Sequence, residues 1–308
     1  MKNIKRILLA LDGIDQQDAL IASVVAFTKK TDVQVTLLSV LDRPPSKLEV
    51  GIEPLELKKL MTEDRLEQLE NVASELRKHA VQVTVKVSHG KRYIEIIRES
   101  LSSDYDLIMK PAGSESRIKS VFFGSTDMQL FHLCPCPVWA FKPTHRAQLN
   151  KIMIAVDLLP SDKEKSALAD KVLQWGNYIA GLANAELHVI HTWEMFGEGT
   201  LRSRSVLANT VDKLVEDEKQ RHKKWLEDAF TRNGLLPEQV HLHFHKGEAK
   251  ALIPSIVNDY EIDLLVMGTV GRIGIPGFFV GNTADSVLRQ VNCSVLAIKP
   301  DGFISPVE

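Results

Sequence analysis

The sequence has little of what marks several specialised classes of protein. Three cysteines in 308 residues are too few for a disulfide framework, and no apolar run approaches the roughly 20 residues of a membrane-spanning helix. The first residues lack the long apolar core of a signal peptide. The formal net charge of −2 gives no excess of positive charge for nucleic-acid binding. We therefore expect a cytoplasmic protein of a reducing compartment, without membrane or nucleic-acid partners.

Residue patterns for catalysis and metal binding are missing as well. No spacing indicates a Ser-His-Asp, Cys-His or paired-carboxylate site. Cys134 and Cys136 are separated by one proline, so we expect small packed side chains rather than a redox or metal pair. His241, His243 and His245 alternate along a strand candidate, and three imidazoles can bind zinc. We favour a partly exposed edge-strand face there, and expect neither catalytic residues nor a metal site.

The clearest positive pattern is an internal duplication. Residues 5–12 match residues 150–157, and later segments of the two halves match in the same order. A repeat this long indicates two tandem domains rather than a solenoid, whose repeats have about 20–50 residues. We place the domains at residues 1–146 and 147–308.

Each half alternates short apolar runs with longer amphipathic stretches, as strands and helices do. This alternation predicts an α/β fold with two tandem, doubly wound, five-stranded parallel sheets, whose ligands bind at the carboxyl ends of the strands. The second half has an insertion at residues 196–206, which we predict to be a flexible loop beside the ligand crevice. The strand candidates are residues 7–11, 35–41, 81–87, 107–109 and 138–141, then 152–156, 187–192, 240–245, 264–267 and 295–298.

A glycine-rich loop after the fourth strand of the second half is the most informative motif. Gly268, Gly271 and Gly281 lie between an apolar run and a helix-like segment. Glycine lets the backbone approach an anion closely, and a helix start offers free N–H groups and the positive end of the helix dipole. Asn282 and Thr283 would begin that helix and supply further donors. The loop therefore predicts a cradle for phosphate.

Two charged residues complete the predicted site. Arg272 follows the second glycine and would screen phosphate charge. Asp157 ends the first strand of the second half, and it borders the same crevice if the first and fourth strands are neighbours. Its carboxylate would then accept hydrogen bonds from a sugar or base. The alternative is that the glycines only form turns, because the Walker A and Rossmann spacings are both absent.

These residues carry a resemblance to the universal stress protein family. The loop resembles the family's nucleotide motif, Gly-x2-Gly-x9-Gly-Ser/Thr, with Asn282 in place of Ser/Thr and Thr283 one place later. Asp12 and Asp157 match the strand-one aspartate of the family. The Gly-Thr-Val-Gly-Arg pattern and the closing Ile-Lys-Pro-Asp are most similar to the tandem bacterial members of the E type. The resemblance covers nearly the whole chain.

The resemblance implies sheets with the strand order 3-2-1-4-5 and, as in a subset of the family, binding of ATP or AMP. We expect ATP as the ligand, with ADP or AMP as alternatives and Mg²⁺ as a candidate accompanying ion. Members often associate through their last strands, so residues 138–141 and 295–298 are expected to pair inside the chain as a pseudo-dimer. A homodimer is left open. The implied nucleotide-site residues are Asp157, Met267, Gly268, Gly271, Arg272, Gly281, Asn282 and Thr283.

The first half departs from the motif. Pro111 stands in place of Gly268 and removes a backbone N–H, while Lys110 replaces Met267 and Glu115 adds negative charge. We expect that the first half does not bind ATP in the family manner. Its crevice is filled, holds another small molecule, or forms an interaction surface.

The sequence thus predicts a stress-response protein that binds an adenine nucleotide through its second half. One alternative is a slow ATPase or phosphoryl-transferring enzyme, and another is a structural adaptor with vestigial sites. Fast phosphoryl transfer needs a positioned base or metal-fixing carboxylates. Near the loop only Asp285, at a greater distance, carries a carboxylate, so we favour binding over turnover.

Overall fold

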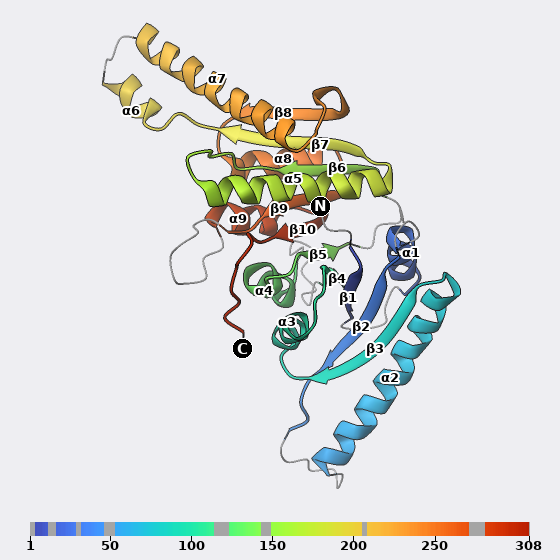
Figure 1. Cartoon of the computed structure of the whole chain (residues 1–308). Helices are drawn as coiled ribbons and strands as arrows, with labels where there is room; N and C mark the ends of the chain where they lie inside the picture. Colours follow the sequence, from blue (N-terminus) through green and yellow to red (C-terminus); the bar gives the residue numbers. More distant parts are fainter. Residues whose placement is uncertain are drawn as a thin grey trace. The chain divides into compact units, whose positions relative to one another are not determined.

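The computed structural model describes residues 4–11, 17–28, 32–45, 53–113, 123–142, 149–204, 208–270 and 281–307. Its helices and strands are labelled in Figure 1. The chain divides into two compact units: unit 1 comprises Met1–Leu149 with Cys293–Glu308, and unit 2 comprises Asn150–Asn292. The predicted domain boundary between residues 146 and 147 lies outside the described residues.

Unit 1 has a parallel sheet with the strand order β3-β2-β1-β4-β5, as the resemblance implied. Helices α1 and α2 pack together, and so do α3 and α4. The last strand of the chain, β10, pairs antiparallel with β5, with Leu296 opposite Trp139, which confirms the expected pairing of the last strands. The elements are β1 (Arg6–Ala10), α1 (Gln17–Thr28), β2 (Gln34–Leu41), α2 (Pro54–Lys78), β3 (Gln82–His89), α3 (Arg92–Ser102), β4 (Leu107–Pro111), α4 (Ser125–Leu133), β5 (Val138–Phe141) and β10 (Ser294–Ile298).

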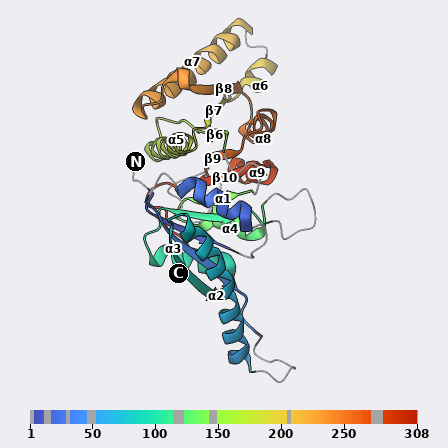
Figure 2. The same ribbon diagram turned by 90° about the vertical axis from the view of Figure 1, so that its right-hand side faces the viewer.

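Unit 2 repeats the arrangement, with four parallel strands in the order β9-β6-β7-β8. Figures 1 and 2 show α5 and α7 on one face of these strands and α8 and α9 on the other. The sheets are therefore doubly wound, as predicted. The elements are β6 (Lys151–Ala155), α5 (Lys163–Ala183), β7 (Glu186–Trp193), α6 (Glu198–Ser203), α7 (Ala208–Arg232), a 3₁₀ turn (Pro237–Gln239), β8 (Val240–Lys246), α8 (Ala249–Asp259), β9 (Leu264–Gly268) and α9 (Asn282–Gln290).

The central strands are buried on both faces because nearly every side chain in them is apolar. Ile7, Leu8 and Leu9 of β1 are fully buried, and so are Ile152 and Ile154 of β6. Helices on both sides of each sheet cover these residues. The continuous apolar runs in the sequence therefore mark the middle of each sheet.

A pair of matched aspartates joins the first strand of each unit to the fourth. The Asp106 carboxylate accepts hydrogen bonds from the backbone N–H groups of Lys5 and Arg6, at 2.8 and 3.0 Å. The Asp263 carboxylate accepts the same two bonds from Asn150 and Lys151, at the same distances. Each aspartate thus satisfies amides at the start of a neighbouring strand. The duplication visible in the sequence has preserved this contact in both units.

The prediction of a flexible loop over residues 196–206 is wrong for Glu198–Ser203, which form α6. Gly197 precedes the helix with a φ of 76°, a conformation that glycine adopts without strain. Within α6, Arg202 donates to Glu198 at 3.0 Å, and Glu198 also pairs with Lys246 of β8 at 2.5 Å. Two glycines in the sequence suggested a loop, whereas ion pairs with a distant strand stabilise a helical turn.

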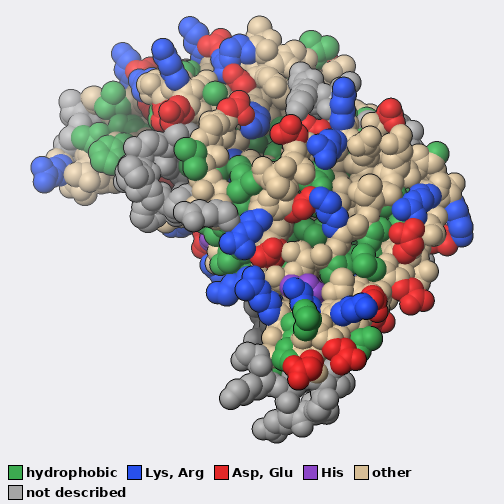
Figure 3. Space-filling model, turned by 60° about the horizontal axis from the view of Figure 1, so that its bottom comes forward, with side chains coloured by type: hydrophobic (Ala, Val, Ile, Leu, Met, Phe, Trp, Pro, Cys, Tyr) green, Lys and Arg blue, Asp and Glu red, His purple; other side chains and the backbone are tan. Residues whose placement is uncertain are grey.

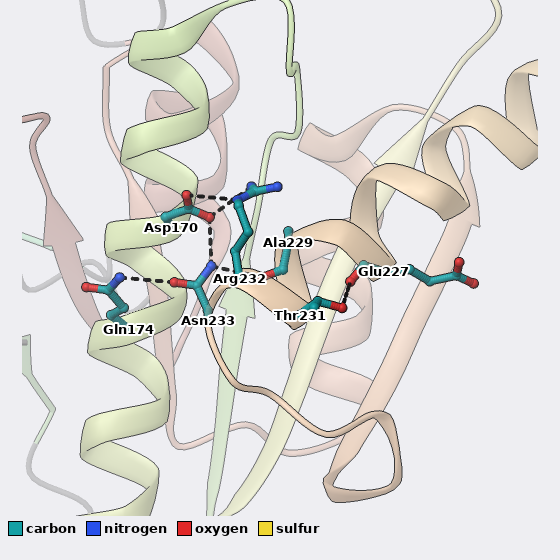
Figure 4. A network of polar contacts seen from close by, with 7 residues as sticks. All are labelled: Asp170, Gln174, Glu227, Ala229, Thr231, Arg232 and Asn233. Atoms are coloured by element: carbon teal, nitrogen blue, oxygen red, sulfur yellow. Dashed lines mark hydrogen bonds and ion pairs between the residues drawn. The ribbon is translucent and has the colours of Figure 1, made fainter.

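The end of α7 is fastened to α5 by a polar network (Figure 4). The Asp170 carboxylate on α5 accepts hydrogen bonds from Arg232 at 3.0 and 3.3 Å and from the Asn233 amide at 2.7 Å. Gln174, one turn along α5, donates to the Asn233 side-chain oxygen at 3.0 Å. The two long helices on this face of unit 2 are therefore held in register at one end.

Charges of both signs are mixed on the surface. On the face shown in Figure 3, Lys and Arg side chains lie among Asp and Glu side chains, with hydrophobic side chains between them. This mixture accords with the small formal net charge of −2. No helix of the described residues is long and apolar enough to cross a membrane.

Candidate functional site

A cavity of about 720 Å³ opens in unit 2 at the carboxyl ends of β6, β7 and β9. In a doubly wound sheet this is where ligands bind, because the crossover helices diverge beside the first strand. Most of the wall is apolar, and a cavity of this size suits a small organic molecule. The polar residues that line it are Asp157, Lys165, Thr192, Asn282 and Thr283.

Six of the eight predicted site residues line this cavity. Gly271 and Arg272 lie outside the described residues. The structure thus brings the two ends of the glycine-rich loop to the same cavity as the end of the first strand. The six lining residues are Asp157, Met267, Gly268, Gly281, Asn282 and Thr283.

Strand pairing explains how residues so far apart in the sequence meet. Strands β6 and β9 are parallel neighbours, with Ala155 opposite Met267. The next residues of both strands therefore emerge at the same edge of the sheet. The first and fourth strands of unit 2 are therefore neighbours, and Asp157 and Gly268 border one crevice.

Gly268 allows close packing between β9 and α5. A Cβ atom at this position would lie 2.9 Å from the Cδ2 atom of Leu168 on α5. Leu168 is itself buried and lines the cavity. A larger side chain here would push against the helix and narrow the cavity. The glycine therefore shapes the cavity as well as beginning the loop.

The start of α9 offers amides to the cavity. Gly281 precedes the helix and makes no side-chain cap, and the first amides of a helix have no carbonyl partner inside it. By contrast, the Asp162 carboxylate caps α5 by accepting from the Glu164 and Lys165 amides, both at 3.1 Å. Of the three helix starts beside the cavity, α5 is capped by Asp162 and α8 follows the carboxylate-bearing Glu248, so α9 is the one best suited to receive an external anion.

Lys165 is a lining residue that the sequence motif did not predict. It lies in the first turn of α5, lines the cavity, and places its Nζ atom 3.3 Å from the Asp157 carboxylate. The Lys165 side chain is 26% exposed and that of Asp157 is 78% exposed, so the pair is open to solvent and weak. A ligand could therefore take either partner at little cost. The sequence carried one indication of this role: Lys165 is a basic residue in the first turn of the helix that follows Asp157.

His191 lies directly behind the cavity. It is buried, its Nδ1 atom donates to the Val156 carbonyl at 3.1 Å, and its Nε2 atom is 2.8 Å from Nδ1 of His222 on α7. Burial lowers the pKa of His191. Because Val156 lines the cavity, this side chain supports the wall from behind. It is a packed core residue rather than a lining one.

The other strand histidines form a second group. His188 of β7 and His243 of β8 are buried, with Nδ1 of His188 at 2.9 Å from Nε2 of His243. His241 stacks on His188 with ring centroids 4.8 Å apart, and Tyr260 packs edge-on against His243. Among the described residues no group of three or more His, Cys, Asp or Glu side chains could hold a metal ion.

Comparisons with known proteins agree with this architecture. The model of the universal stress protein family matches residues 3–142 and 148–299. Universal stress protein E of Escherichia coli K12 is 30% identical over 230 residues, which make up 74% of this chain and 72% of that protein. The tandem match confirms that both halves of the chain are copies of one domain.

Solved structures show the same fold. A protein of unknown function from Pseudomonas aeruginosa PAO1 has a TM-score of 0.74 and 27% identity, over 97% of this chain and 93% of that chain. A putative universal stress protein from Pseudomonas aeruginosa UCBPP-PA14 has a TM-score of 0.72 and 26% identity, over 97% and 94% of the two chains. The similarity therefore extends over both repeats.

Proposed function

We infer that this chain, which belongs to the universal stress protein family, binds an adenine nucleotide in the cavity of unit 2. One observation carries the proposal: the end of β6, the end of β9 and the uncapped start of α9 all line a single cavity. The strand-one aspartate, the first glycine and the last glycine of the loop motif lie there together. ATP, ADP and AMP share the groups that this arrangement would recognise.

The residues that line the cavity support a proposed place for each part of the nucleotide. Phosphate oxygens would accept from the first amides of α9 and from Asn282 and Thr283, with Lys165 nearby as a cation. The Asp157 carboxylate would accept hydrogen bonds from sugar hydroxyls or from the base. Apolar side chains such as Val156 and Ile190 would cover the base and sugar. The ligand would thus run from the β6 end toward α9.

A divalent cation would play a secondary part. Mg²⁺ binds nucleotides mainly through phosphate oxygens and waters, with one or two carboxylates. Asp157 is the one carboxylate among the described lining residues. It could orient a hydrated ion, and a second protein carboxylate would have to come from outside this set. Such a site suits binding better than the metal-fixing arrangement of fast phosphoryl transfer.

Gly281→Val is the direct test of this site. A branched side chain at the start of α9 would occupy the place of the phosphates, so we expect the affinity for ATP to fall at least about tenfold, or about 1.4 kcal/mol. Isothermal titration calorimetry with ATP, ADP and AMP on the full chain measures the loss. Gly181→Val on α5 is the control, because a Cβ atom there meets nothing within 4 Å.

Unchanged affinity in Gly281→Val would contradict the site. Steady release of phosphate from ATP by the unaltered chain would favour the slow-ATPase alternative. If the unaltered chain binds no nucleotide even at millimolar ATP, the result would instead favour the alternative of a structural adaptor with vestigial sites.

A further inference from the structure

Unit 1 contains an almost completely buried ion pair at the place that corresponds to the cavity of unit 2. Lys110, near the end of β4, places its Nζ atom 2.9 Å from the Oδ1 atom of Asp127 on α4. The two side chains are 2% and 1% exposed. Charged groups are rarely buried this far unless their partners are close and well arranged. The pair is therefore a specific feature of unit 1.

The second oxygen of Asp127 is also surrounded by donors. Its Oδ2 atom accepts from the Gly124 amide at 3.0 Å and from the Gly113 amide at 3.1 Å. Burial raises the pKa of Asp127, and the Lys110 ammonium and these two amides oppose that rise. The Asp127 carboxylate thus lies between the end of a strand and the start of a helix, where amides and an ammonium hold it. These are the contacts that a phosphate oxygen would make there.

The duplication provides an internal comparison. Gly124 precedes α4 as Gly281 precedes α9, so Lys110 corresponds to Met267 and Asp127 to Ala284. Met267 and Ala284 both line the cavity of unit 2. Neither can supply a charge. At these two positions unit 1 therefore has a buried carboxylate with its counterion, whereas unit 2 has two apolar side chains that line the cavity.

We propose that the Asp127 carboxylate is the resident anion of unit 1, held by Lys110 and the amides of Gly113 and Gly124, and that it excludes anionic ligands from this place. An incoming phosphate would meet a negative charge whose donors are already occupied. The inference rests on the proposed function of unit 2 only for the comparison between the units. The contacts of Asp127 belong to unit 1 alone.

A second cation lies close to the pair. Lys142, which follows β5, has its Nζ atom 5.1 Å from the centre of the Phe123 ring. Burial lowers its pKa to about 8, while Cys293 and, to a smaller extent, Asp127 oppose the change. Removing the Asp127 carboxylate would therefore leave Lys110 buried near another amine and two amide donors. That environment would favour a small anion taken from solution.

Anion rescue of Asp127→Ala is the test. We expect this variant of the full chain to unfold at a lower temperature and to lose hydrogen-exchange protection in peptides from β4 and α4. Formate is small enough to replace the missing carboxylate. It should restore both properties, relative to chloride at the same ionic strength, and should change neither in the unaltered chain.

Two control variants make the test specific. Lys110→Met with Asp127→Ala copies the Met267 and Ala284 pair of unit 2. It should be more stable than Asp127→Ala alone, because the buried Lys110 ammonium is no longer left without a counterion. It should respond to formate much less, because the ammonium that would hold formate is gone. Asp285→Ala removes a first-turn acid of α9 that pairs with Arg289 and is 32% exposed. It should show no formate response.

The outcomes separate the possibilities. Wild-type stability of Asp127→Ala, or an equal formate effect in all variants, would overturn the proposal. If Asp127→Ala does not fold, folding of the double variant supports the proposal and its failure to fold overturns it. None of these measurements involves nucleotide, so a failure of ATP binding in unit 2 would be recognised separately by titration.

Discussion

At the scale of single residues, the cavity of unit 2 is defined by a few polar side chains in an apolar wall. Asp157 and Lys165 face each other in an exposed pair, and Asn282 and Thr283 begin α9. Because the pair is weak in water, a phosphate could draw Lys165 away from Asp157. Lys165 would then bind the negatively charged phosphate, and Asp157 would accept hydrogen bonds from the sugar hydroxyl groups. This division of roles can be tested one residue at a time.

Lys165→Met should weaken binding of ATP by about tenfold, because hydrogen bonds to charged groups contribute about 1.5–3 kcal/mol. Binding of adenosine should stay the same, since adenosine carries no phosphate. Titration calorimetry of both ligands measures the difference. The control is Lys163→Met, which removes an exposed lysine of the same helical turn. Equal losses for ATP and adenosine would contradict a phosphate-binding role for Lys165.

At the scale of elements, the pairing of β7 with β8 brings histidines together. His188 and His243 are buried and 2.9 Å apart at their nearest nitrogens. Burial lowers the pKa of His188 to about 4, with His243 and His241 adding to the effect, and burial also lowers the pKa of His243. Glu186 and Lys151 act on His188 in opposite directions. Burial therefore favours the neutral imidazole at His188 and His243.

This arrangement predicts a loss of stability in acid. A histidine whose folded-state pKa is lowered binds more protons when unfolded, so its stabilising effect is complete above the unfolded pKa of about 6.5 and falls as the pH drops toward 4. For His188 the loss is at most about 3 kcal/mol, from about 1.4 kcal/mol per pKa unit. Urea unfolding at pH 7.5, 6, 5 and 4.5 measures it.

His188→Gln should flatten that pH dependence, whereas His245→Gln, at an exposed position of β8, should leave it unchanged. The same slope in all three proteins would show that the buried pair has no part in the effect.

At the scale of the whole molecule, the duplication preserves contacts of structure more faithfully than contacts of the candidate site. Asp106 and Asp263 make the same two backbone hydrogen bonds at the same distances. At the candidate site, in contrast, unit 1 has Lys110 and Asp127 at the positions where unit 2 has Met267 and Ala284. The two copies thus share a scaffold while differing where a ligand would bind.

The matched aspartates allow each unit to be perturbed by itself. Asp106→Ala should lower the free energy of unfolding by about 1–3 kcal/mol, because the exposed Lys5 amide and the part-buried Arg6 amide lose a charged partner. The lost hydrogen-exchange protection should be concentrated in β1 and β4. Asp263→Ala should do the same in β6 and β9. Asp104→Ala, at an exposed position nearby, is the control. Equal loss of protection in both units from either variant would contradict local roles for these carboxylates.

The sequence by itself determined the duplication and most element positions, because matching residues and the period of apolar residues are local properties of the chain. The strand order followed from the resemblance to the universal stress protein family. It also located both ends of the glycine-rich loop, since glycine and helix-start residues have local signatures. It failed at α6, where ion pairs with distant residues overrode two glycines. Only the tertiary structure decided which side chains meet: Lys165 with Asp157, His188 with His243, and Lys110 with Asp127. The physical reason is that these contacts depend on helices and strands far apart in the chain packing side by side, and no local pattern encodes that proximity.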